Sequence, residues 1–174
     1  MAKKVFVVLF LCIVAMCCVY AGKVGFVAQG SPYSTQTVSS SGEKYVSTYG
    51  YGFKVGFRYE LFNHFTVGLD ASDTIYKYKI LEYDYLVIGL RAVVGYTVNF
   101  NERFFANCEF GAGFSFRSIG EKRQKSHGIN VYLGGGFRLS NELALTLGAE
   151  MDYGRQSKST DLAFKSQIGL VLSM

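Results

Sequence analysis

Proline, tryptophan and histidine are scarce in this sequence of 174 residues, which contains one proline, no tryptophan and two histidines. Of the four cysteines, only Cys108 lies outside the amino-terminal segment. One cysteine cannot form an internal disulfide. A zinc site needs three or four convergent ligands, and histidines, of which the chain has only two, are scarce. The sequence therefore predicts no disulfide and no metal centre, and Cys108 is expected to be a small apolar side chain.

Two glycine-rich triplets, Gly111–Gly113 and Gly134–Gly136, have the composition of phosphate-binding loops. No helical pattern follows either of them, and such loops bind phosphate at the N-terminus of a helix. We expect no nucleotide and no other cofactor.

The amino terminus has the pattern of a secretory signal, because two lysines precede an apolar run from Val5 to Met16 and small residues follow it. We expect residues 1–21 to be a cleaved signal peptide. Residues 22–174 are expected to form one domain of an exported chain.

Two alternatives for this terminus stay open, an uncleaved anchor helix and lipidation at Cys17 or Cys18. Neither changes the interpretation of the remaining chain. Removal of Lys3 and Lys4 lowers the formal net charge from +5 to +3. A charge this small gives no reason to expect a nucleic-acid partner.

Beyond the signal, apolar side chains recur at every second position, which is the pattern of strands with one apolar and one polar face. In residues 84–100 the apolar face carries Leu86, Ile88, Leu90, Ala92, Val94, Tyr96 and Val98, and the other face carries Gly89, Arg91, Gly95 and Thr97. The pattern predicts eight strands, near residues 23–29, 45–60, 65–75, 84–98, 103–117, 127–139, 143–154 and 161–173. No helical segment separates them, so the sequence favours an all-β, eight-stranded antiparallel up-and-down barrel.

Short and long connections alternate along the chain. The short ones centre on Asn63, Asn101 and Asn141, and asparagine tolerates the left-handed backbone conformation of tight hairpins. The longer, polar ones are expected at residues 30–44, 76–83, 118–126 and 155–160. Outer-membrane barrels have short periplasmic turns and long external loops, so this asymmetry predicts a transmembrane β-barrel and its orientation.

The size of the side chains indicates which face lies inside. Glycines fill the polar face and bulky residues fill the apolar face, whereas the interior of a small barrel has little room. We therefore expect the polar face inside and the apolar face in lipid, opposite to a soluble lipocalin-like carrier, which is the alternative. Aromatic girdles are expected near the turns at Tyr59, Phe62, Phe65, Tyr96, Phe100 and Phe104, and near the loops at Tyr45, Tyr49, Tyr78, Tyr83, Tyr85, Phe116 and Tyr153.

Charges of both signs lie on the predicted inner face in nearly equal numbers. Unpaired buried charges are costly, so we expect a paired network that plugs the lumen, with a narrow, porin-like channel as the alternative. The expected members are Lys54, Arg58, Asp70, Arg91, Glu109, Arg117, Arg138, Glu150, Asp152 and Lys165.

The carboxyl terminus, from Gln167 to Met174, has a polar residue, then a glycine and alternating apolar residues. It resembles the last-strand assembly signal of outer-membrane proteins, although Met174 stands where an aromatic residue is usual. With the strand pattern, nearly the whole mature chain resembles the small eight-stranded outer-membrane proteins of the OmpA transmembrane-domain and OmpX type. This resemblance implies insertion by periplasmic chaperones and the barrel-assembly machinery into the cell outer membrane.

We expect a non-enzymatic membrane protein that serves envelope integrity or surface interaction through its loops. The basic loop residues Lys122, Arg123 and Lys125 are candidates for contact with lipopolysaccharide phosphates or another surface ligand. A lipid-modifying enzyme is the alternative. His127 would be its base, with Ser126 or Ser157 nearby, but no motif joins them.

Overall fold

The computed structural model describes residues 23–40, 42–62, 64–79, 84–119, 122–156 and 159–174. The expected signal peptide at 1–21 lies outside them. The strands are β1 (Val24–Ser40), β2 (Glu43–Val46), β3 (Tyr49–Phe62), β4 (Phe65–Lys77), β5 (Tyr85–Asn99), β6 (Phe104–Ile119), β7 (Lys122–Arg138), β8 (Leu143–Arg155) and β9 (Ser159–Ser173).

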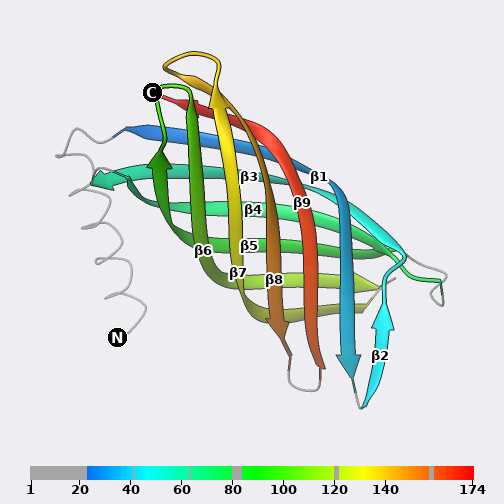
Figure 1. The fold of residues 1–174 in the computed structure, drawn as a ribbon. Helices are drawn as coiled ribbons and strands as arrows, with labels where there is room; N and C mark the ends of the chain where they lie inside the picture. The colour runs from blue at the N-terminus through cyan, green and yellow to red at the C-terminus, as the bar shows by residue number, and fades with distance from the viewer. Residues whose placement is uncertain (1–22, 41, 63, 80–83, 120–121, 157–158) are drawn as a thin grey trace, which may run out of the picture.

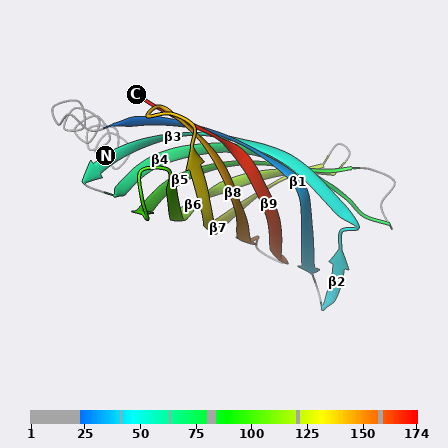
Figure 2. The ribbon, with the colours of Figure 1, turned by 45° about the horizontal axis from the view of Figure 1, so that its top comes forward.

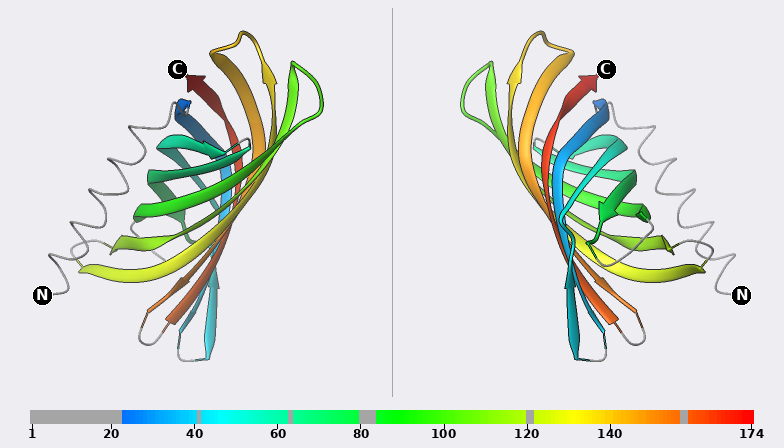
Figure 3. Two further views of the ribbon diagram at one scale, coloured as in Figure 1. Left: turned by 90° about the vertical axis from the view of Figure 1, so that its left-hand side faces the viewer. Right: turned by 90° about the vertical axis from the view of Figure 1, so that its right-hand side faces the viewer.

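Eight of these strands close into one antiparallel barrel (Figures 1 and 3). Each of the strands β3 to β8 pairs with the next in sequence, and β1 pairs with both β3 and β9. The short strand β2 pairs only with the end of β1 and projects beyond the barrel wall (Figure 2). The eight-stranded up-and-down barrel predicted from the alternation is confirmed. In the described part of the chain, no helix is long and apolar enough to span a membrane.

The short turns lie at the end of the barrel where the described chain begins and ends (Figure 1). There the backbone of Val24 and that of Met174 exchange two hydrogen bonds, of 3.1 and 2.7 Å. The turn after β5 is capped by the Asn101 side chain, whose oxygen accepts hydrogen bonds from the backbone amides of Arg103 and Phe104.

The left-handed backbone conformation suggested for the turn asparagines is not found at Asn101 or Asn141. Among the described residues other than glycine, only His64 has a positive φ, of 85°. Asn101 therefore acts through its side chain, and Ser140, beside Asn141, does the same for the turn after β7. Asn63 lies outside the described residues.

Much of what the sequence suggested as long loops is strand. β1 continues through the serine- and threonine-rich segment to Ser40, because the second half of this strand pairs with β9 and its last residues also pair with β2. Likewise β6 and β7 remain paired as far as Ile119 and Lys122. At the end of the barrel opposite the short turns, the connections therefore consist largely of paired strands that extend the barrel wall.

The apolar faces of the strands point outward. Most of their large apolar side chains are exposed, for example Leu90, Leu133, Leu147 and Ile168. Cys108 is also exposed, on the same face. A lipocalin-like carrier would have this face inside, so that alternative is wrong.

The aromatic girdle is only partly as expected. Tyr49, Tyr96, Phe100, Phe104 and Tyr153 are exposed on the exterior, but Tyr59 is buried. Tyr78 and Tyr85 are also buried, and they pack with Tyr76 into an internal cluster. Tyr85 shares the inward parity of Arg91, so the alternation itself places it inside. Tyr83 lies outside the described residues.

Candidate functional site

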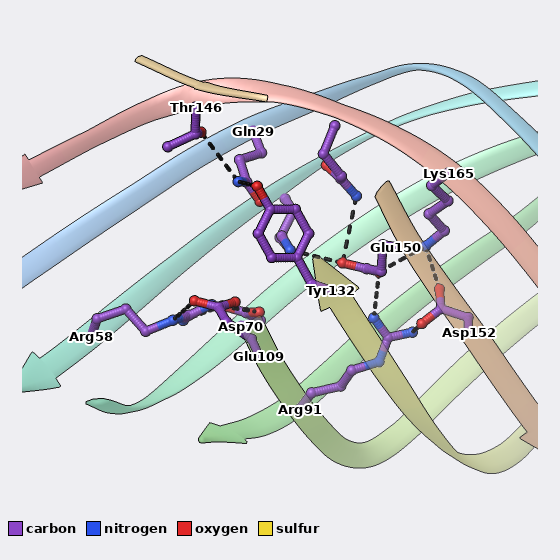
Figure 4. Close-up of polar contacts among 12 residues, drawn as sticks. Gln29, Arg58, Asp70, Arg91, Glu109, Tyr132, Thr146, Glu150, Asp152 and Lys165 are labelled. Atoms are coloured by element: carbon purple, nitrogen blue, oxygen red, sulfur yellow. Dashed lines mark hydrogen bonds and ion pairs between the residues drawn. The ribbon is translucent and has the colours of Figure 1, made fainter. Parts of the chain in front are cut away.

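The lumen is crossed by three groups of ion pairs, and the first is centred on Arg58 from β3 (Figure 4). Its guanidinium donates to Glu109 at 2.8 and 2.7 Å and to Asp70 at 2.6 and 3.0 Å. All three side chains are buried. Two bidentate contacts hold one cation between two carboxylates, a geometry that the planar guanidinium matches and an ammonium does not.

The second group is centred on Glu150 of β8 (Figure 4) and lies farther from the short turns than the first. Its carboxylate contacts Lys54 at 2.7 Å, Arg91 at 3.2 Å and Lys165 at 3.7 Å. Asp152 joins the same group, 2.8 Å from Arg91 and 2.6 Å from Lys165. The network therefore links β3, β5, β8 and β9 across the lumen.

Tyr132 lies between these two groups (Figure 4). Its ring is 4.8 Å from the Lys54 ammonium, and its hydroxyl accepts a hydrogen bond of 3.3 Å from Gln29. A Cβ atom on Gly148 would come within 2.6 Å of this ring, and one on Gly134 would overlap it. Glycine on the inner face thus makes room for the few long side chains that fill the lumen.

The third group is the buried pair of Arg117 and Asp161, near the end opposite the short turns. Gln36 donates to Asp161 at 3.1 Å and accepts from the Tyr78 hydroxyl at 2.8 Å. Burial raises the pKa of Tyr78, so this hydroxyl remains a proton donor. Asp161 is not among the residues predicted for the lumen, although it shares its parity with Lys165.

Arg138 does not join the ion pairs among the described residues. Its guanidinium lies near the short turns, where it donates to Asn99 at 2.6 Å and to the Glu102 carbonyl at 3.2 Å and stacks over Phe105. The groups that do pair are five cations and five carboxylates, whose formal charges cancel: Lys54, Arg58, Arg91, Arg117 and Lys165 with Asp70, Glu109, Glu150, Asp152 and Asp161.

These pairs divide the interior into separate cavities. A cavity of about 170 Å³ lies at the turn end and includes Arg58 and Glu109 in its lining. A void of about 20 Å³, room for about one water molecule, lies between the second and third groups. Beyond the third group the barrel opens into an outer vestibule of about 850 Å³.

The outer vestibule has a mixed lining. Tyr78 and Tyr85 are buried tyrosines in this lining, while Lys44 and Lys79 are exposed. The other described lining residues carry hydroxyls, amides or apolar groups, and none of these described residues is a carboxylate: Val38, Ser40, Tyr45, Val46, Ser47, Thr48, Gln124, Gln156 and Ser159.

Of the remaining candidates, Lys125 and His127 lie on the outer surface of the barrel. Lys125 is exposed, with its ammonium 4.9 Å from the ring of Phe114. The side chains of Lys122 and Arg123 lie outside the described part. His127 points outward and Ser126 is buried inside, where it pairs with Ser115 at 2.7 Å, so these two are not a catalytic pair. Ser157 is outside the described residues, which contain no cluster of metal-ligating side chains.

No family model matches the sequence, and no curated protein does. Solved structures are similar in fold. Neisserial surface protein A superposes with a TM-score of 0.64 at 14% identity, over 87% of this chain and 97% of that one. The attachment invasion locus protein Ail of Yersinia pestis gives 0.57 at 17% identity, over 89% and 100%. OprG of Pseudomonas aeruginosa gives 0.54 at 13% identity, over 86% and 95%.

The resemblance inferred from the sequence is thus confirmed for the fold. The chain is an eight-stranded barrel of the type found in small outer-membrane proteins. Its exterior is apolar, as a barrel surrounded by hydrocarbon requires.

Proposed function

We propose that this chain is a non-enzymatic integral protein of the outer membrane, with a lumen that does not conduct and an outer end that contacts surface ligands. The observation that carries the proposal is the set of ion pairs across the lumen. Glu150 alone contacts cations from three other strands, and the described cavities on either side are separate.

A sealed lumen follows from the energetics of these pairs. Ions passing through would have to separate buried charges, and breaking a buried pair costs about 3–5 kcal/mol. Reconstitution in planar bilayers tests this. We expect no steady conductance from the wild-type chain, whereas regular single-channel steps would favour the narrow channel instead.

The outer vestibule is the part best suited to a surface ligand. Tyrosine rings, hydroxyls and amides suit a sugar, and Lys44 and Lys79 without a lining carboxylate favour an acidic one. The structure of Ail has been solved with the heparin analogue sucrose octasulfate, a compound that serves as a probe here. We expect calorimetry to detect binding of this probe, and K44Q/K79Q to weaken it. Equal binding by the variant and the wild type would contradict this role.

The enzymatic alternative has its own test. Expression of the chain in a double-membraned bacterium, followed by mass spectrometry of lipid A, would reveal a modification. We expect unchanged lipid A masses, and a new species that disappears in His127→Ala would support an enzyme.

A further inference from the structure

The outer surface of β7 and β8 changes abruptly from apolar to basic. On β7 the outward side chains from Ile129 to Leu139 are apolar apart from a glycine, and the next two outward positions are His127 and Lys125. On β8 the apolar series ends at Tyr153, and Arg155 is the next outward residue.

The height of this change matches the edge of a membrane. Ten residues at about 3.3 Å each, in a strand tilted by about 45°, rise roughly 23 Å, close to the ~25 Å apolar band of outer-membrane barrels. If the turn end lies at the inner boundary, His127 lies at the outer boundary, level with the headgroups. Arg155 lies directly beside it, since His127 and Arg155 are paired in the sheet.

The three basic side chains form one exposed cluster. Lys125 is paired with Phe116 and lies over Phe114, whose own partner is His127. None of the ion pairs among the described residues includes Lys125, His127 or Arg155. The cluster therefore presents basic side chains to the headgroup layer, and no carboxylate of the described residues is bonded to it.

An apolar groove of about 450 Å³ lies directly below the cluster on the lipid side. It spans β7, β8, β9 and β1, which are neighbours in the sheet (Figure 1). Its lining includes the apolar side chains of Val131, Leu133, Ala149, Met151 and Phe164, together with Tyr33 and Thr35 of β1. The pair Val131 and Met151 lies four residues along the strands from the pair His127 and Arg155, which is two outward positions away.

We infer that this surface binds one phosphate-bearing lipid of the outer leaflet, with its phosphate on Lys125, His127 and Arg155 and an acyl chain in the groove. The inference rests on the proposed location in the outer membrane. It deepens that proposal by naming a site. The opposite wall differs, because there Lys77 is paired with Asp84 at 3.8 Å and Asp73 is exposed.

Native mass spectrometry of the refolded chain tests the site, with diphosphoryl lipid A as the probe and phosphatidylcholine as the zwitterionic comparison. Each basic residue near an anionic lipid surface contributes about fivefold to binding, so K125Q/R155Q should weaken lipid A binding roughly thirtyfold. Phosphatidylcholine binding should change little. K77Q, which removes an outward lysine elsewhere on the wall, should bind lipid A as the wild type does.

Ala149→Trp fills the groove and should reduce lipid A retention, whereas Ala71→Trp, on the exposed face of β4, should not. Lipid A retention by K125Q/R155Q equal to that of the wild type would overturn the inference, as would equal retention by Ala149→Trp and Ala71→Trp. Heat-modifiable gel migration of every variant is measured in parallel. A wild-type chain that fails to insert into bilayers would refute the outer-membrane proposal, whereas inserted variants without a lipid phenotype would refute only this site.

Discussion

Arg58 offers the most demanding test of the lumen. Among the described residues, it is the one cation bonded to both Asp70 and Glu109, through four hydrogen bonds of 2.6 to 3.0 Å. Arg58→Met removes the cation and leaves two buried carboxylates facing each other. Removing one partner of a buried ion pair costs about 3–5 kcal/mol, so we expect the free energy of unfolding to fall by this amount.

Two further variants separate charge from packing. Arg58→Lys keeps the charge but loses the bidentate geometry, and should lose about half as much stability. R58M/D70N/E109Q removes all three charges together, and because such neutral replacements are often tolerated, it should recover to within about 1–2 kcal/mol of the wild type.

The assay is reversible urea unfolding of the barrel in lipid vesicles, followed by gel migration and tyrosine fluorescence. The reasoning would be refuted if R58M unfolded at the wild-type urea concentration, because the carboxylates would then be solvated in the native barrel. It would also fail if the triple variant were as unstable as R58M, since packing and not charge would then explain the loss.

Three other predictions use the same assay. Gly148→Val places atoms against Tyr132 and should cost about 1–3 kcal/mol, and an equal loss in a Tyr132→Ala background would show that this clash is not the cause. Leu147→Arg puts a charge on the exposed lipid face and should lower the free energy of unfolding by about 2–4 kcal/mol. Phe116→Arg, nearer the outer boundary, should lower it by about 0–1 kcal/mol. Equal losses would mean that the membrane does not surround the apolar band. Asn101→Ala removes two hydrogen bonds that cap the turn after β5 and should lower the free energy of unfolding by about 1 kcal/mol. The control Asn141→Ala should lower it less. No difference between the two variants would contradict the assigned role of the Asn101 side chain.

The strand alternation was sufficient to predict the barrel and the direction of each face. A lipid-facing strand must alternate because one side meets hydrocarbon and the other a crowded polar lumen, so Arg91 and Leu90 are distinguishable from parity alone. Beyond the membrane this constraint ends. The segment from Ser34 to Ser40 has polar residues on both faces, so its strand character depends on pairing with β9 and β2, which the local sequence does not reveal.

The candidate site shows the same limit. Parity places Arg138 inside correctly, but it does not show how close a residue lies to the open end of the barrel. Arg138 reaches Asn99 there instead of a carboxylate. Asp161 was overlooked although the predicted strand 161–173 includes it, because as the first residue of that strand it borders the segment 155–160 that was expected to be a loop. Contacts such as that between Arg58 and Glu109 cross the lumen between non-adjacent strands, and alternation carries no information about them.

The absence of tryptophan allows a direct test of which face meets lipid. Single tryptophans introduced as Leu90→Trp, Leu133→Trp and Leu147→Trp replace exposed side chains, and Tyr132→Trp replaces one that is 1% exposed in the lumen. In vesicles of lipids brominated on their acyl chains, we predict strong quenching of the first three and little quenching of Tyr132→Trp. Strong quenching of the lumen tryptophan, with the other three unquenched, would contradict a barrel whose apolar side faces hydrocarbon.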